Sequence, residues 1–190
     1  MDKKGKLQDD NGLDQLWQKL RSGDRHALGV LFSATFDSLY KYGYRIIPNS
    51  EKVRDAIQEV FFQLWKYRKN LSKPSSVRAY LFVSLRRELL NRKKAAKRRE
   101  EKNKKYYDEE FDPLLNYSKW DEILNLQEKE SKGLKKAIDK LTPRQREIIY
   151  LKYYEGLSTD EISKILDIRA QSIYNFMSES IKMLRLFLDR

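Results

Sequence analysis

Cysteine is absent from this 190-residue chain, and glycine, proline and histidine are scarce, with 7, 4 and 1 residues. Without cysteine there can be no disulfide and no thiolate metal site, which is typical of proteins from a reducing compartment. The low glycine and proline content favours an all-α fold. The first ten residues contain no apolar core of a signal peptide, and no run approaches the length of a membrane span. We therefore expect a cytoplasmic protein with no membrane insertion.

Recognisable catalytic motifs are also missing. The single histidine, His26, follows a predicted turn at Gly23-Asp24 and has no triad partner. There is no glycine-rich phosphate loop, no nucleophile elbow and no group of histidines at metal-ligand spacing. The many Asp and Glu residues fall on charged helical faces, where solvation explains them. We expect a protein that is not an enzyme and has no catalytic residue, metal, cofactor or small-molecule substrate.

Positive charge is concentrated in one segment. The formal net charge is +12, and residues 78–105 hold twelve basic and three acidic residues, so this segment alone carries +9. Such a local excess suits the phosphates of a polyanion and favours nucleic acid as a partner. A solvated, lysine-rich helix end is the simpler alternative. Binding to a membrane surface is disfavoured, because the apolar residues of this helix have the pattern of a protein core.

Apolar spacing predicts a first helical domain. The apolar residues within 13–20 form one helical face. Those within 28–39 form another, which consists of Leu28, Leu31, Phe32 and Leu39. Residues 53–65 follow the i, i+3, i+4 pattern for more than three turns. A loop at residues 70–76 breaks the pattern, and Ser75 or Ser76 can cap the next helix, which carries the basic segment.

The helix predicted over residues 52–67 has a second, largely polar face. Each residue turns a helix by ~100°, which places five residues away from the core stripe: Asp55, Gln58, Glu59, Phe62 and Gln63. One interpretation is a docking surface, in which an aromatic anchor ringed by carboxylates selects a basic partner protein. The other is that Phe62 packs on the first helix, since single apolar residues off the core stripe are common. The periodicity leaves both open.

Residues 142–185 predict a helix-turn-helix. The segments Thr142–Gln145 and Ser158–Glu161 both have the form of a capping box, and a tight turn at Asp167-Ile168 precedes a helix from about Ala170. The expected core stripe of that helix is Ile173, Met177, Ile181 and Leu184. Off this stripe lie Gln171, Ser172, Tyr174, Asn175 and Ser178, bracketed by Arg169 and Lys182. Such side chains can bond to base edges or phosphates, which favours DNA, whereas the alternative is a helical hairpin that binds protein.

The chain between these helical regions reads as a linker. From about Arg99 to Glu130 the periodicity weakens, acidic and aromatic residues alternate, and Asp112-Pro113 breaks any continuous helix. A short helix is expected around Trp120–Leu126. We predict an all-α protein of two small helical domains: residues 12–98, an acidic and aromatic linker at 99–130, and a helix-turn-helix domain at 131–190.

Three motifs, in order along the chain, resemble bacterial RNA polymerase sigma factors. Asp55–Trp65 resembles the helix that grips the polymerase clamp. Val77–Arg87, followed by Arg92–Lys94, is similar to the helix for the minus-ten promoter element. Leu141–Glu147 with Gly156–Leu166 resembles the C-terminal helix-turn-helix that reads the minus-thirty-five element.

The order and spacing of these motifs and the absence of a middle domain fit the small extracytoplasmic-function group. Tyr174-Asn175 in the last helix is similar to members from Bacteroidetes-type bacteria. Around the turn of the helix-turn-helix the chain departs from the family pattern, because Asp167 stands where a glycine is usual and Arg169 where a capping serine is usual. We therefore expect a weak start of the last helix.

The resemblance implies a transcription initiation factor that binds core RNA polymerase, directs it to specific promoters and assists promoter melting. The implied polymerase-binding residues are Asp55, Gln58, Glu59, Phe62 and Gln63. The implied minus-ten DNA-binding residues are Lys73, Tyr80, Arg86, Arg87, Asn91, Lys93, Lys94 and Arg98. The implied minus-thirty-five DNA-binding residues are Arg169, Gln171, Ser172, Tyr174, Asn175, Ser178 and Lys182.

The resemblance also implies how the linker acts and a further partner. The acidic linker would thread the polymerase channel that later holds RNA. An anti-sigma factor at the inner membrane would hold the protein inactive. Melted minus-ten bases would be captured by the 70–76 loop and Tyr80, since such bases need stacking and pocket contacts.

Two other classes of protein stay open at this point. A self-sufficient helix-turn-helix repressor or activator would bind duplex DNA tightly without polymerase. A structural or RNA-binding basic protein would bind without sequence preference. Promoter-specific transcription with purified core enzyme separates these classes from an initiation factor.

Overall fold

The computed structural model describes residues 10–103 and 137–188, and most of these residues lie in helices. The chain separates into two compact units, Met1–Pro113 and Leu114–Arg190. No β-strand occurs within the described ranges. The all-α class predicted from composition and periodicity is confirmed.

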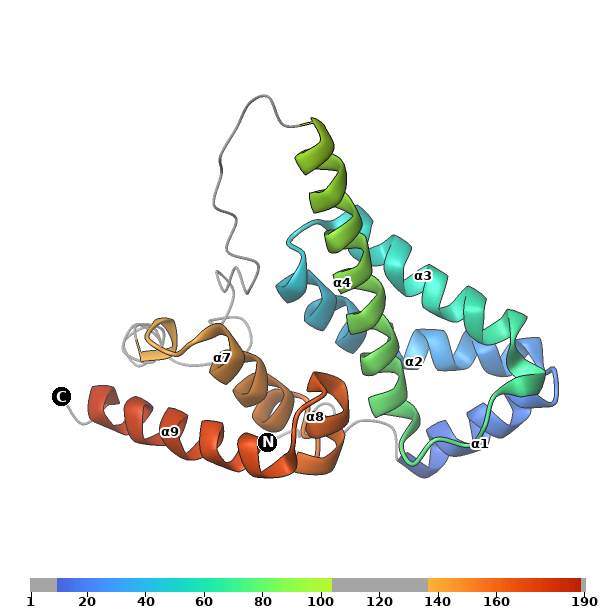
Figure 1. Ribbon diagram of the computed structural model, residues 1–190. Coiled ribbons are helices and arrows are strands. Elements are labelled where there is room, and N and C mark those ends of the chain that lie inside the picture. The colour runs from blue at the N-terminus through green and yellow to red at the C-terminus, as the bar shows by residue number, and fades with distance from the viewer. Residues whose placement is uncertain (1–9, 104–136, 189–190) are drawn as a thin grey trace. The chain divides into compact units, whose positions relative to one another are not determined.

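The first unit packs its helices around an apolar core. Figure 1 shows how these helices are arranged. Its described elements are α1 (Asp10–Arg21), α2 (Arg25–Ile46), α3 (Ser50–Lys66), the short 3-10 helix η1 (Arg68–Asn70) and α4 (Val77–Asn103). Polar caps set several starts. The Asp24 carboxylate accepts from the amides of His26 and Ala27 at the start of α2. The hydroxyl of Ser76, one of the two caps that the sequence offered, accepts from the amide of Ala79 at the start of α4.

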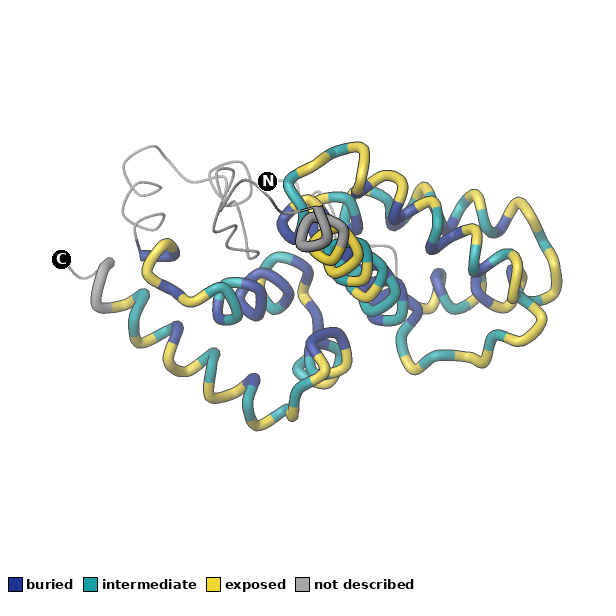
Figure 2. Tube along the Cα trace, turned by 45° about the horizontal axis from the view of Figure 1, so that its top comes forward, coloured by how far each residue is buried: buried dark blue, intermediate teal, exposed yellow. Residues whose placement is uncertain are grey.

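Helices α2, α3 and α4 approach one another closely at Gly43. A Cβ atom added at Gly43 of α2 would lie 2.8 Å from a methyl carbon of Val53 in α3 and 3.3 Å from one of Leu89 in α4. Glycine therefore lets three helices approach closely, because any side chain here would overpack the core. The buried stripe of α2 differs from the predicted one, since Leu28 and Phe32 are only half-buried. Figure 2 shows how buried and exposed positions alternate along the helices.

Helix α4 carries the basic segment, as the sequence predicted. It continues to Asn103, past residue 98, where we placed the end of the first domain. Figure 1 shows it running beyond the helices on which it packs. The rest of the predicted linker, with the short helix expected at residues 120–126, lies outside the described residues.

The second unit contains the predicted helix-turn-helix. Its elements are α7 (Pro143–Ile149), the π-helical turn η2 (Tyr150–Tyr154), α8 (Thr159–Leu166) and α9 (Ala170–Leu188). Both predicted capping boxes are present, at Thr142 with Gln145 and at Ser158 with Glu161. Helix α8 ends at Asp167, whose φ of 53° is left-handed, and α9 begins three residues later. The sequence did not predict η2, where the buried Tyr150 hydroxyl donates to the buried Glu155 carboxylate at 2.5 Å.

Helix α9 buries less of its apolar stripe than the spacing predicted. Ile173 and Ser180 are buried, whereas Met177, Ile181 and Leu184 are half-buried. Helix α9 has 19 residues, while its described partners α7 and α8 have 7 and 8. At about 1.5 Å per residue these short helices can cover only part of its length.

Candidate functional site

The five residues of the predicted docking surface lie on one side of α3, opposite its buried stripe. Asp55, Gln58 and Phe62 are exposed, while Glu59 and Gln63 are half-buried. Phe62 exposes 56% of its surface, so it is not buried against the first helix. The face therefore presents one large aromatic ring among carboxylate and amide groups.

A shallow groove adjoins Phe62. Arg25 and Leu28 of α2 line it together with Phe61, Phe62 and Trp65 of α3. A groove of this composition suits the apolar side of a partner helix. Sequence reasoning missed this feature, because helical periodicity assigned Leu28 and Trp65 to the core and cannot show that two helices leave a gap between their side chains.

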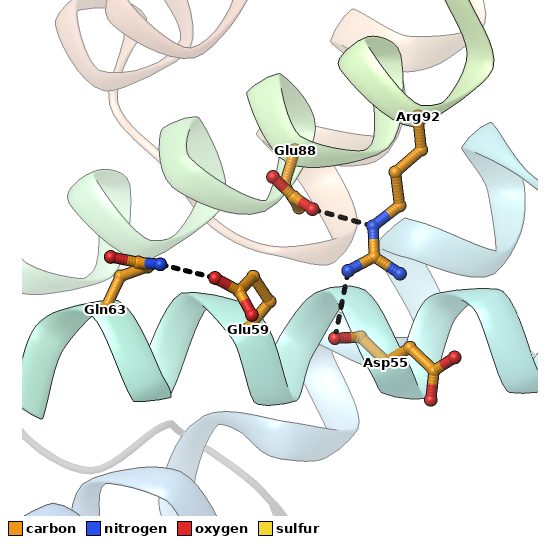
Figure 3. A network of polar contacts seen from close by, with 5 residues as sticks. All are labelled: Asp55, Glu59, Gln63, Glu88 and Arg92. Carbon is orange, nitrogen blue, oxygen red and sulfur yellow. Dashed lines mark hydrogen bonds and ion pairs between the residues drawn. The ribbon is translucent and has the colours of Figure 1, made fainter. Parts of the chain in front are cut away.

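Polar contacts connect this face of α3 to α4 (Figure 3). The Nε of Arg92 lies 2.6 Å from a Glu88 carboxylate oxygen, and its Nη2 donates to the Asp55 carbonyl oxygen at 3.4 Å. On α3, the Gln63 amide donates to the Glu59 carboxylate. Arg92 belongs to the basic segment, yet its half-buried side chain points toward α3 and joins the two helices.

The predicted minus-ten residues on α4 divide into an exposed stripe and a flank. Arg87, Asn91, Lys94 and Arg98 are all exposed, and their spacing of four, three and four residues returns to one side of a helix. Tyr80 lies on the same side, seven residues before Arg87, and is half-buried. The stripe from Tyr80 to Arg98 is about 27 Å long at 1.5 Å per residue. Arg86 and Lys93 are half-buried beside it.

The 70–76 loop, which precedes α4, is attached to α1. The indole nitrogen of Trp17 donates to the Ser72 carbonyl oxygen at 3.1 Å, and Lys73 Nζ lies 2.9 Å from a carboxylate oxygen of Asp14. The Trp17 ring also meets Tyr80 edge-on, with centroids 5.0 Å apart. Lys73, predicted as a DNA contact, therefore has an acidic partner within the protein. Sequence reasoning missed Asp14 and Trp17 as neighbours of the loop, because contacts across 55 or more residues leave no periodic signal.

The predicted minus-thirty-five residues gather on the outward side of α9. Those exposed on the helix are Gln171, Tyr174, Asn175, Ser178 and Lys182, and Arg169 is exposed just before it. Ser172 is half-buried at the edge of this face.

Two hydrogen bonds organise the polar groups around this face. The Gln171 amide donates to the Asn175 side-chain oxygen at 3.1 Å. On α7, the Gln145 amide donates to a Glu179 carboxylate oxygen at 3.3 Å. This contact ties the Glu179 carboxylate to α7.

The described residues include no cluster of three His, Cys, Asp or Glu side chains suited to a metal ion. Within the same ranges no helix combines the length and the apolar character needed to cross a bilayer.

Comparison with known families gives two matches along the chain. Residues 31–99 match the family described as Sigma-70 region 2, and residues 131–184 match Sigma-70, region 4. Together the matches cover well over half of the chain. The first contains α3 and the α4 stripe, and the second contains α7, α8 and most of α9.

Curated relatives are similar over nearly the whole chain. The ECF RNA polymerase sigma factor SigK of Mycobacterium tuberculosis (strain H37Rv) is 24% identical over 178 residues, which cover 93% of this chain and 94% of that protein. The protein of the same name from Mycolicibacterium vanbaalenii is 24% identical over 175 residues, which cover 91% of this chain and 87% of that protein.

Solved structures share the fold. CnrH, in complex with the cytosolic domain of CnrY, has a TM-score of 0.61 at 18% identity, with 94% of this chain and 97% of that chain covered. The sigma factor RpoE from Bartonella quintana, in complex with the anti-sigma factor NepR, has a TM-score of 0.57 at 20% identity, with 83% and 94% covered.

Proposed function

The chain belongs to the sigma-70 family, within its extracytoplasmic-function group, and from this premise we propose that three of its surfaces carry three separate tasks. As a sigma factor it directs RNA polymerase to begin transcription, which makes it a regulator of transcription rather than a catalyst. The docking face of α3 binds core polymerase, the α4 stripe with the 70–76 loop takes the minus-ten element, and the outward face of α9 reads the minus-thirty-five element.

Polymerase docking is assigned to Asp55, Gln58, Glu59, Phe62 and Gln63. Support comes from the exposed ring of Phe62 beside an apolar groove, with two carboxylates on the same helix face. Aromatic anchors near the centre of an interface contribute a large part of its binding energy, and the flanking charges select a basic partner.

The single observation that carries the minus-ten assignment is the exposed α4 stripe of Arg87, Asn91, Lys94 and Arg98. Three cations on one face attract phosphates regardless of sequence. Tyr80 begins the stripe beside the 70–76 loop and offers a ring on which an unstacked base can be held, which assists promoter melting. Arg86 lies at the flank of the stripe, whereas the ammonium nitrogen of Lys93 is buried and does not face solvent.

The minus-thirty-five assignment rests on the polar outward face of α9. Gln171 and Asn175 are joined by a hydrogen bond and can present their remaining amide groups to adenine edges. Arg169 and Lys182 lie at the two ends of this face, where phosphate contacts fix the register of a recognition helix. Ser172, Tyr174 and Ser178 complete the surface.

Regulation and origin are finer proposals. The similarity to CnrH and RpoE, whose structures were determined with CnrY and with the anti-sigma factor NepR, supports an anti-sigma partner for this chain. The pair Tyr174-Asn175 supports the Bacteroidetes-type assignment. A sigma factor works where polymerase and chromosome are, which supports the cytoplasm as its location.

A run-off transcription assay tests this function. Purified core polymerase, the chain and a template carrying the DNA upstream of its own gene are expected to give a transcript with one discrete start, which core enzyme alone does not give. A template with the minus-ten element scrambled serves as the control. Tight, sequence-specific binding to duplex DNA without any gain of transcription would identify a self-sufficient repressor or activator instead.

A further inference from the structure

Helix α1 is fastened to the 70–76 loop by contacts that the assigned function does not use. The indole of Trp17 is fully buried, and its one polar atom donates to the Ser72 carbonyl oxygen in the middle of the loop. A buried indole N–H needs a partner, and here that partner is loop backbone rather than another helix. The position of Ser72 is therefore set by α1.

The same tryptophan also orients Tyr80. The two rings meet at an interplanar angle of 67° in an edge-to-face arrangement. This contact covers part of the tyrosine, which is half-buried although it lies on the otherwise exposed stripe of α4. One side chain thus fixes both the loop backbone and the first aromatic ring of the minus-ten face. A binding surface ordered in advance loses less conformational freedom when it takes up a base.

The second contact concerns charge. The Lys73 side chain is 57% exposed, but its ammonium group lies 2.9 Å from Asp14, whose side chain is 31% exposed. While this pair is closed, the carboxylate offsets the only cationic side chain of the 70–76 loop. Exposed ion pairs add little stability, so the effect of Asp14 is on where positive charge is available and not on the fold.

We propose that Asp14 and Trp17 of α1 are positioning residues for minus-ten recognition: Trp17 fixes the 70–76 loop and Tyr80 for base capture, and Asp14 keeps Lys73 from acting as a phosphate contact. This inference rests on the proposed function of α4 and the loop. It makes α1 a determinant of promoter preference even though neither residue touches DNA.

Replacing Trp17 by phenylalanine tests the first half. Trp17→Phe keeps an aromatic ring against Tyr80 and removes the N–H that holds Ser72. Transcription by the reconstituted holoenzyme is measured on templates carrying each single base change in the minus-ten element. We expect discrimination to fall about fivefold or more at one or two positions, which corresponds to about 1 kcal/mol of base readout. Affinity for core polymerase and preference in the minus-thirty-five element stay unchanged.

A matched control separates positioning from loss of stability. Tyr150→Phe also removes a buried aromatic donor while keeping the ring, but it does so in the second unit. It is expected to lower the free energy of unfolding without changing minus-ten preference. If Trp17→Phe lowers transcription equally on every template, or leaves every base preference as in the natural protein, Trp17 has no positioning role.

The Asp14–Lys73 pair is tested by salt dependence. Binding of the holoenzyme to a single-stranded minus-ten oligonucleotide is measured over a series of salt concentrations for Asp14→Asn, Lys73→Gln and the double variant. Freeing Lys73 adds one phosphate contact, so Asp14→Asn should steepen the slope of log K against log salt by about 0.7. Lys73→Gln alone should have the same slope as the natural protein. The double variant should also have the slope of the natural protein, because it lacks the lysine that Asp14→Asn would free.

The opposite pattern would overturn this half of the proposal. A flatter slope for Lys73→Gln, with no change for Asp14→Asn, would mean that Lys73 contacts phosphate in the natural protein. Asp37→Asn, the same chemical change at an exposed carboxylate of α2, is the control. Failure of the natural chain to start transcription with core enzyme would instead contradict the proposed function, and so the two failures are distinguishable.

Discussion

Asp167 shows how one residue sets the geometry of the helix-turn-helix. It ends α8 with a φ of 53°, a left-handed conformation that costs most residues other than glycine roughly 1–2 kcal/mol. Its amide still donates to the Ser163 carbonyl oxygen, which satisfies one of the last carbonyl groups of α8. The departure from the family's usual glycine therefore leaves the turn in place and adds backbone strain.

We expect Asp167→Gly to stabilise the second unit. Glycine adopts a positive φ without strain but loses more conformational entropy on folding, so the net gain should be about 0.5 kcal/mol. The amides of α8 and α9 should then exchange their hydrogens more slowly with solvent.

Asp160→Gly, within the first turn of α8, is the control and should speed exchange, because glycine weakens a helix interior. Unchanged or faster exchange in Asp167→Gly would mean that the aspartate is not strained at this position.

At the scale of single helices, α4 and α9 carry similar spacing but different chemistry. Both expose side chains in steps of four, three and four residues. On α4 three of the four exposed residues are cations. On α9 the first three are the amides Gln171 and Asn175 and the hydroxyl of Ser178, and only the fourth, Lys182, is a cation. The first face suits phosphates and the second suits base edges.

This difference predicts two kinds of variant. Asn175→Ala should change the base preference at particular positions of the minus-thirty-five element, by ~1–3 kcal/mol. Lys94→Ala together with Arg98→Ala should weaken all promoters alike and make the salt dependence shallower. Both are measured by transcription from a promoter library at several salt concentrations.

An equal loss on every upstream sequence for Asn175→Ala would make α9 a scaffold rather than a reader. Ser33→Ala, at an exposed polar position of α2, is the reference for a substitution outside the assigned surfaces.

Elements with a strong local signal were predictable from the sequence. The two capping boxes, the Ser76 cap, the turn at Asp167 and the outward positions of α3 and α9 follow from spacing of three or four residues. Features that depend on distant parts of the chain were not. The hydrogen bonds from Trp17 to Ser72 and from Arg92 to Asp55 arise from the packing of separate segments. Periodicity along one helix does not predict such contacts.

The sequence also did not predict the irregular turn after α7 or the burial that follows from the relative lengths of α7, α8 and α9. The π-helical turn η2, with its buried Tyr150–Glu155 hydrogen bond, was not predicted from the sequence. The sparse burial of Met177, Ile181 and Leu184 depends on how short α7 and α8 are relative to α9. Neither property is encoded in the spacing of the residues concerned.

At the scale of the molecule, the first unit combines two surfaces of different charge on neighbouring helices. The α3 face presents Asp55 and Glu59, and the α4 stripe presents Arg87, Lys94 and Arg98. Helices α3 and α4 pack together, and Arg92 of α4 donates to the Asp55 carbonyl oxygen of α3, so the proposed docking face and the proposed DNA face belong to one compact unit. Under the proposed assignment, this arrangement would let the factor hold polymerase and promoter together.

The account depends most on the docking face of α3, because promoter recognition acts only through bound polymerase. The decisive measurement is the affinity of Phe62→Ala with Glu59→Lys for purified core RNA polymerase, beside the natural chain and Tyr153→Ala, an exposed aromatic of the second unit. Loss of a central aromatic anchor costs about 2 kcal/mol or more, so we predict at least about a 30-fold weaker affinity with unchanged helicity by circular dichroism. Tyr153→Ala should bind like the natural chain. An unchanged affinity for the double variant, with its helicity intact, would contradict the assignment of this face.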